Sequence, residues 1–78
     1  WEADQDRLSI QRRFKFKGFK ESMAFVNQVA ELAESEGHHP EIRINWNRVV
    51  LALSTHAIGG LSENDFIVAA KINKLLPS

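Results

Sequence analysis

The sequence predicts an α+β fold in which a four-stranded antiparallel sheet carries helices packed on one face. Two observations indicate this fold. Stretches of alternating apolar and polar residues, typical of half-buried strands, occur in pairs, and a stretch with helical spacing follows each pair. The resulting order is β-β-α-β-β-α, which is most simply arranged as two hairpins in one sheet with both helices against it. The length predicts one domain, residues 1–78.

The first hairpin is expected at the beginning of the chain. Residues 8–16 alternate as a strand does, with Arg12 as the one interruption of the apolar face, which suggests an edge or a site. The polar residues 4–7 suggest a turn, so residues 1–4 are expected to form a short partner strand.

The first helix is expected over residues 19–36, where apolar residues recur at helical spacing. Gly18 with Glu21 three residues later gives a partial capping box at its beginning. Gly37 is a residue type typical of helix C-termini, and Pro40 prevents the helix from resuming.

The second hairpin is expected to follow directly. Residues 41–46 alternate, residues 47–48 suggest a turn, and residues 48–56 read as a second strand. This second strand has apolar residues on both faces, which is typical of a central strand, and two glycines at 59–60 end it.

The last helix begins after Ser62, an N-cap residue with Asp65 at the N3 position. From Phe66 to Leu76 it is apolar nearly all round. A terminal helix in so small a domain cannot bury every side within its own fold, so we expect part of it to contact another subunit.

Composition narrows the function classes. The ten basic and ten acidic residues balance, so nothing in the total charge calls for nucleic acid or a membrane surface, and no apolar run approaches a membrane span. The basic residues of segment 12–20 are expected to form a solvated strand face. The absence of cysteine excludes disulfides and thiolate zinc sites, which raises the expectation of self-association in a chain with a small core. The beginning of the sequence has no signal-peptide pattern, so a reducing, cytoplasmic location is the default.

All three histidines lie within one 19-residue stretch, with His38 and His39 before Pro40 and His56 at the end of the expected strand. The open end of the second hairpin brings His56 back beside His38 and His39. Imidazole can donate and accept a proton near neutral pH, so three of them in one pocket indicate proton-transfer chemistry.

Three alternatives stay open for these histidines. Each could be a surface or capping residue. They could hold a metal ion, although adjacent histidines lack the i, i+4 spacing of helical zinc pairs. Ser54 or Thr55 could form a nucleophilic triad with His56, although no nucleophile-elbow glycine pattern surrounds either.

The spacing of these residues also resembles a known family. The pattern Glu34-x3-His38-His39-Pro40-x5-Trp46-x9-His56-x8-Asp65 resembles the signature of the pterin-4a-carbinolamine dehydratases, and the resemblance covers essentially the whole chain. Supporting matches are Phe14-Lys15-Phe16-Lys17, Asn47-Arg48-Val49, Ser54-Thr55-His56 and Gly60-Leu61-Ser62. Trp46 fits the aromatic position of the family, although a tryptophan in such a strand more often packs in a core.

The resemblance implies the same sheet-and-helix fold and a lyase activity. A 4a-hydroxytetrahydrobiopterin dehydratase converts its carbinolamine substrate to quinonoid dihydropterin plus water, without a redox cofactor or a metal. By position, His38 and His56 resemble the acid and base, in an order that stays open, and His39 resembles the residue that contacts and orients the pterin.

The remaining site residues are also assigned by resemblance. Glu34 and Asp65 are candidates to hold the pyrimidine edge or fix an imidazole tautomer, although Asp65 also suits helix capping. The backbone of Ser54 and Thr55 would line the pterin plane.

Two positions depart from the family, because Gly37 stands where many relatives have an acidic residue and Ile42 where many have a tryptophan. Ile42 can still offer an apolar wall. Relatives usually carry another helix before the position of Trp1, so either the chain begins late or that helix has been removed.

The expected partners are a pterin substrate and further copies of this chain, as a homodimer or homotetramer. Some relatives instead act as partners of a transcription factor through a helical surface, and the apolar 66–76 helix suits either role. Self-association is favoured because a small domain must cover such a surface.

Overall fold

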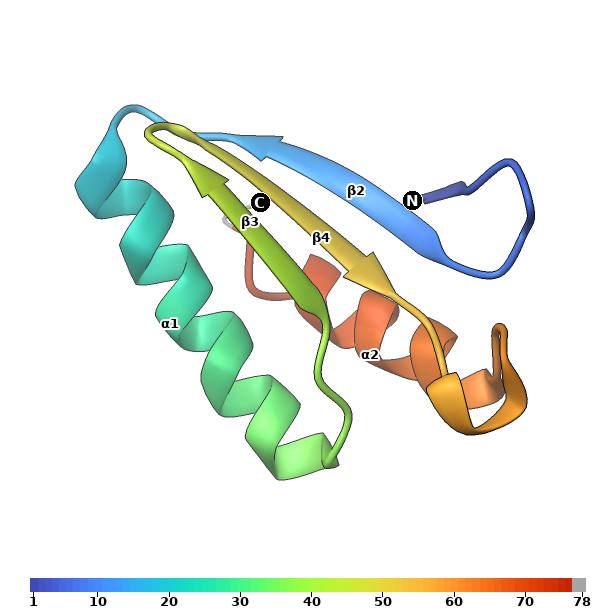
Figure 1. The fold of residues 1–78 in the computed structure, drawn as a ribbon. Coiled ribbons are helices and arrows are strands. Elements are labelled where there is room, and N and C mark those ends of the chain that lie inside the picture. The colour runs from blue at the N-terminus through green and yellow to red at the C-terminus, as the bar shows by residue number, and fades with distance from the viewer. Residues whose placement is uncertain (77–78) are drawn as a thin grey trace.

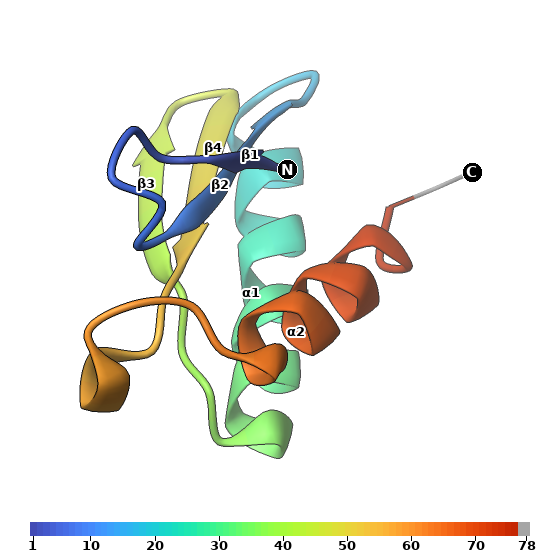
Figure 2. The same ribbon diagram turned by 90° about the vertical axis from the view of Figure 1, so that its right-hand side faces the viewer.

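The computed structural model describes residues 1–76, without the side chain of His56. Four strands form one antiparallel sheet in the order β1-β2-β4-β3, and two helices cover one of its faces, as predicted (Figures 1 and 2). The strands are β1 (Glu2–Ala3), β2 (Ile10–Lys15), β3 (Glu41–Asn45) and β4 (Arg48–Leu53), and the helices are α1 (Phe19–Glu36) and α2 (Glu63–Asn73).

The core lies between β4 and the two helices. Val49, Leu51 and Leu53 of β4 are fully buried and pack with Val29 of α1 and Ile72 of α2. Because side chains alternate along a strand, the residues between them point to the other face of the sheet, which no helix covers. The prediction that this is a central strand is confirmed, because β4 pairs with β2 on one side and with β3 on the other.

The short first strand is confirmed as well, and the end of α2 explains Arg12. Asn73 Oδ1 accepts hydrogen bonds from Trp1 Nε1 at 2.9 Å and from Arg12 Nη1 at 2.5 Å. The Arg12 guanidinium also lies 4.8 Å from the centre of the Phe14 ring. Arg12 interrupts the apolar face of β2 because it reaches the end of a helix there.

Helix α1 has the predicted bounds, and Gly37 ends it in the left-handed conformation with φ of 63°. In that turn the His38 N–H donates to the Ala33 carbonyl at 3.1 Å. Gly18 is the N-cap of this helix as predicted, but the capping box with Glu21 is wrong, because no described side chain caps this end. Ser22 donates through both N–H and Oγ to the Gly18 carbonyl.

Several predicted bounds are wrong by a few residues. Strand β2 begins at Ile10 rather than at residue 8, and the β3–β4 turn is Trp46–Asn47, with Trp46 exposed at φ of 53° rather than in the core.

Strand β4 ends at Leu53 rather than at His56. The chain leaves the sheet there because Thr55 N–H donates to the Gly60 carbonyl at 2.6 Å, which closes a tight loop. The backbone of His56 therefore begins the short 3-10 helix η1 (His56–Ile58) instead of ending a strand.

Helix α2 follows the Ser62 cap as predicted but ends at Asn73 rather than at Leu76. Its Val68 and Ile72 are buried, whereas Phe66 is 54% and Ile67 40% exposed, so this helix leaves part of its apolar surface outside the fold. Neither helix within residues 1–76 is long and apolar enough to cross a membrane.

We predict that Gly37→Ala lowers the free energy of unfolding by about 1 kcal/mol, because a Cβ is disfavoured in the left-handed conformation. No atom lies within 4 Å of the position that the Cβ would take, so the cost comes from the backbone alone. Gly37→Asn should restore most of the loss, because asparagine tolerates this conformation. Urea unfolding at one protein concentration measures both, and an equal loss in the two variants would contradict the explanation.

Candidate functional site

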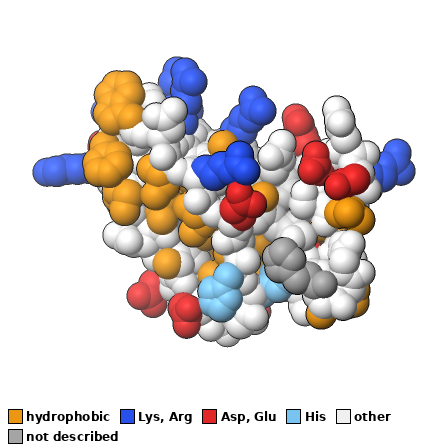
Figure 3. Space-filling model, viewed as in Figure 1, with side chains coloured by type: hydrophobic (Ala, Val, Ile, Leu, Met, Phe, Trp, Pro, Cys, Tyr) orange, Lys and Arg blue, Asp and Glu red, His pale blue; other side chains and the backbone are white. Residues whose placement is uncertain are grey.

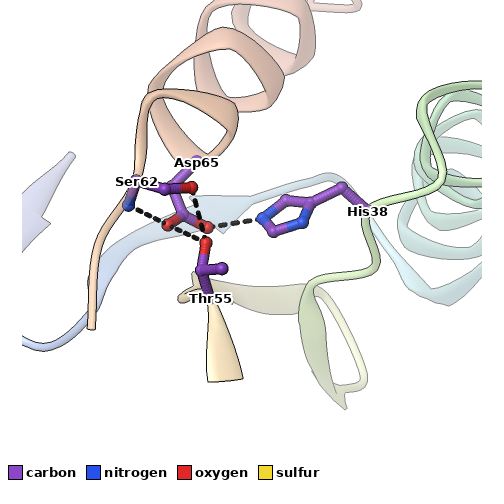
Figure 4. A network of polar contacts seen from close by, with 4 residues as sticks. All are labelled: His38, Thr55, Ser62 and Asp65. Atoms are coloured by element: carbon purple, nitrogen blue, oxygen red, sulfur yellow. Dashed lines mark hydrogen bonds and ion pairs between the residues drawn. The ribbon is translucent and has the colours of Figure 1, made fainter. Parts of the chain in front are cut away.

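The centre of the site is the carboxylate of Asp65, which is fully buried in the first turn of α2. Its Oδ2 accepts hydrogen bonds from the Ser62 N–H at 2.9 Å and from the Thr55 hydroxyl at 2.8 Å. Its Oδ1 lies 2.5 Å from His38 Nε2 (Figure 4). The Thr55 hydroxyl has one hydrogen, which it gives to Asp65, so the Ser62 hydroxyl at 2.7 Å donates to Thr55.

The hydrogen bonds keep Asp65 ionised despite its burial. Burial by itself would raise the pKa of this carboxyl, but hydrogen bonds from His38, the Ser62 N–H and Thr55, together with the charge of His38, lower the pKa below its ordinary value of 3.8. A carboxylate can only accept, so Nε2 of His38 carries a hydrogen. Nδ1 of the same ring is therefore the atom that can take up or release a proton.

The left-handed Gly37 turns the chain at the end of α1, directly before His38. The His38 side chain lies against the Asp65 carboxylate and is only 16% exposed. The ring and its acidic partner come from positions 27 residues apart, so the α1–β3 connection and the beginning of α2 must pack together before the pair exists.

His39 lies in a different environment from His38. Its Nε2 is 2.9 Å from Glu34 Oε1, but His39 is 61% and Glu34 79% exposed. Exposed pairs of this kind contribute about 0–1 kcal/mol to stability, so this one leaves the ring free to turn toward a ligand.

A hollow of about 370 Å³ lies beside these residues on the uncovered face of the sheet. In Figure 3 the pale blue histidines lie together at the lower part of that face. The hollow combines polar groups with a low apolar floor, and its volume is within the range of small-molecule sites. Its lining is Leu8, Ser9, His39, Glu41, Ala52, Ser54, Thr55, Gly59 and Gly60; we call it the histidine hollow.

The structure brings together most of the predicted site residues. His38, Thr55 and Asp65 form one network, and His39, Ser54 and Thr55 line the histidine hollow, with Glu34 bonded to His39. The side chain of His56 lies outside the described residues, so its predicted role stays a prediction.

Two predicted residues lie elsewhere. Ile42 pairs with Leu51 across the β3–β4 ladder and packs against the core, so it faces the helices rather than the histidine hollow. Gly37 ends α1 through its left-handed backbone conformation and does not line the histidine hollow.

Sequence reasoning missed part of the lining. Glu41 reaches the histidine hollow because β3 aligns it with Ala52 of β4, and that register is not visible in the sequence alone. Leu8 and Ser9 come from the connection that precedes β2. The sequence also predicted that Thr55 lines the pterin plane through its backbone, whereas in the structure the Thr55 hydroxyl donates a hydrogen bond to Asp65. Among the side chains that the structure describes, no group of three His, Cys, Asp or Glu is placed to hold a metal ion.

This arrangement suits proton transfer. A buried carboxylate orients His38 in one tautomer, which is one way in which acidic partners assist catalytic histidines. Thr55 connects the network to the histidine hollow because it both bonds Asp65 and lines that hollow.

Comparisons with known proteins agree with these features. A family model described as Pterin 4 alpha carbinolamine dehydratase matches residues 1–75. The chain is 52% identical over 73 residues to "Pterin-4-alpha-carbinolamine dehydratase 2, mitochondrial" of Arabidopsis thaliana, covering 92% of this chain. It spans only 39% of the length of that relative.

Two solved structures share the fold. A "transcriptional coactivator/pterin dehydratase" from Brucella melitensis has a TM-score of 0.92 and 39% identity, covering 99% of this chain and 82% of the other. A "pterin dehydratase-like protein" described as "a RuBisCO assembly factor in the alpha-carboxysome" has a TM-score of 0.84 and 25% identity, covering 100% and 90%.

We predict that Asp65→Asn lowers the free energy of unfolding by about 2 kcal/mol near pH 7, because buried bonds to a charged group are lost. The pKa of Asp65 in the folded protein is below 3.8, its ordinary value. The ionised carboxylate therefore stabilises the fold fully above pH 3.8, and this stabilisation is lost as the pH falls through the folded pKa. The difference in free energy of unfolding between wild type and Asp65→Asn should shrink below pH 3.8.

The matched control is Glu34→Gln, which alters the exposed acid–histidine pair and should cost less than about 0.5 kcal/mol at any pH. Unfolding curves recorded from pH 7 to pH 3 measure both variants. Equal and pH-independent losses would contradict the role given to Asp65.

Proposed function

The chain belongs to the pterin 4 alpha carbinolamine dehydratase family, and from this premise we propose that it dehydrates 4a-hydroxytetrahydropterins, such as 4a-hydroxytetrahydrobiopterin. The products are the quinonoid dihydropterin and water. The observation that carries the proposal is the His38 ring fixed by the buried Asp65 carboxylate, in a network that Thr55 connects to the histidine hollow.

The reaction needs two proton transfers and no change of oxidation state. The C4a hydroxyl leaves as water after it takes up a proton, and a ring nitrogen of the pterin releases a proton, so the two transfers balance. Nδ1 of His38 serves one transfer, and we assign the other to His56. Because Asp65 holds the hydrogen on Nε2, each protonation state of His38 presents Nδ1 for exchange.

In this proposal the groups around the histidine hollow bind the substrate. We assign His39, paired with Glu34, to contact the pterin, and Ser54 and Thr55 to line its plane. Asp65 is a positioning residue in this scheme, because it is fully buried and acts through His38 and Thr55.

We also propose that the protein works as a homodimer or homotetramer in the cytoplasm. The exposed apolar pair Phe66 and Ile67 on α2 supports self-association, because a core this small gains from covering such surface. The composition without cysteine supports a reducing compartment.

A second candidate function is a protein-interaction module, including a dimerisation partner of a transcription factor. The same Phe66 and Ile67 surface favours it, and so do the names of the two solved structures, one a coactivator and one an assembly factor. It differs from the first candidate in needing no carbinolamine turnover.

We predict that His38→Ala and His56→Ala each lower kcat for carbinolamine dehydration by about 100-fold or more, the usual contribution of a positioned acid or base. His39→Ala should mainly raise KM. The measurement is the dehydration rate of a synthetic carbinolamine after subtraction of the uncatalysed rate, with Asn27→Ala on the exposed side of α1 as control.

Near-native rates in both His38→Ala and His56→Ala would contradict the mechanism. A wild-type protein without activity, combined with partner binding that His56→Ala leaves intact, would favour the interaction module.

We predict that the double variant Phe66→Ser/Ile67→Ser lowers the molar mass measured by light scattering toward 8.9 kDa, the mass of one chain. The control Leu8→Ser changes an equally exposed apolar residue on the β1–β2 connection and should keep the wild-type mass. An unchanged mass in the double variant would show that α2 does not form the interface.

A further inference from the structure

We propose that the pterin site continues along the uncovered sheet face into a second hollow, which receives the substituent at C6 of the pterin through Gln11 and Ser9. This inference rests on the proposed dehydratase function and adds a subsite to it. The second hollow, which we call the sheet hollow, has a volume of about 120 Å³. Its lining is Asp4, Ser9, Gln11, Glu41, Arg43, Val50 and Ala52.

The two hollows adjoin each other. Ser9, Glu41 and Ala52 line both of them, so a molecule in the histidine hollow can extend into the sheet hollow without crossing the core. Both lie on the face of the sheet that the helices leave open, which is the face turned to the viewer in Figure 3.

Strand register explains the shape of the groove. Gln11 of β2, Ala52 of β4 and Glu41 of β3 lie in one row across the sheet. Residues directly opposite on neighbouring strands are close, so the two long side chains flank the short alanine and leave a low floor between them. A bulky residue at position 52 would fill this floor.

Volume limits what the sheet hollow can hold. A water molecule in the liquid takes about 30 Å³, so 120 Å³ is the space of about four waters. A chain of a few carbon and oxygen atoms fits this space.

The lining indicates a substituent with hydroxyl groups. The Gln11 amide both donates and accepts, and the Ser9 hydroxyl does the same. Within residues 1–76, neither side chain forms a hydrogen bond to another described group, so both are available to replace the waters that a ligand displaces.

The charged residues that line the sheet hollow disfavour substituents that carry carboxylates. Asp4 and Glu41 bring two carboxylates, and Arg43 brings one guanidinium, whose Nε already donates to Glu41 Oε1 at 2.9 Å. The excess negative charge disfavours a substituent that itself carries carboxylates, such as a glutamyl group. A short neutral chain with hydroxyls is therefore the chemistry that this subsite recognises.

The test compares two carbinolamines that differ only at C6, one with a dihydroxypropyl group and one with a methyl group. The quantity measured is the ratio of their kcat/KM values. We predict that Gln11→Ala lowers this ratio about 3- to 10-fold, the usual effect of one lost hydrogen bond, mainly through KM of the hydroxylated substrate. Ser9→Ala should lower it in the same direction.

Gln28→Ala is the matched control, because it removes the same side chain from an exposed position on α1. A ratio within twofold of the wild-type value in both Gln11→Ala and Ser9→Ala, with active enzymes, would overturn the subsite and leave the dehydratase function standing. A wild-type protein that dehydrates neither substrate would overturn both.

A third carbinolamine with a glutamyl-bearing group at C6 tests the charge argument. We expect the wild type to have a lower kcat/KM for it than for the dihydroxypropyl substrate, and Glu41→Gln to narrow that gap. A wild type that prefers the glutamyl substrate would overturn the assignment of substituent class.

Discussion

The buried carboxylate of Asp65 ties together three segments that are separate in the sequence. It accepts from its own helix cap, from the residue that follows β4 and from the histidine that follows α1. An ionised group without partners inside a protein is very costly, so these bonds must form together or Asp65 cannot stay buried and charged. The beginning of α2 adds a favourable field for a negative charge. Folding of this corner and orientation of His38 are therefore one event.

The alternation of β4 provides the second constraint. One set of its side chains forms the centre of the core, while the other set, with Val50 and Ala52, forms the floor of the uncovered face. The same strand thus anchors the helices and shapes the groove beside the histidines. Because the sheet is antiparallel and β4 is central, residues from β2 and β3 reach that floor from both sides.

Local patterns predicted the elements that depend on local physics. The bounds of α1 follow from helical spacing ended by Gly37, and the capping pair Ser62 and Asp65 marks the beginning of α2. The resemblance also anticipated that Asp65 could fix a tautomer, and the carboxylate does lie against His38.

The remaining features depend on tertiary contacts that the sequence does not display. Strand β4 ends early because Thr55 pairs with Gly60, which no alternation pattern reveals. Alternation showed that Ile42 and Glu41 face opposite ways, but not which of the two faces bears the histidine hollow. Gln11 carries no motif and gains a place in the groove only through its alignment with Ala52.

The separation between the buried Asp65 and the exposed groove has a consequence for how such a protein can change. Replacing Asp65 removes the partner that orients His38 and also lowers the stability of the fold, so one substitution there has two effects. The groove residues sit on solvated strand faces, where a substitution usually costs little stability. Single substitutions on the sheet surface can therefore change the lining of the groove while the Asp65–His38 pair stays fixed. The row of Gln11, Ala52 and Glu41 can thus be varied without changing the hydrogen bonds at the beginning of α2.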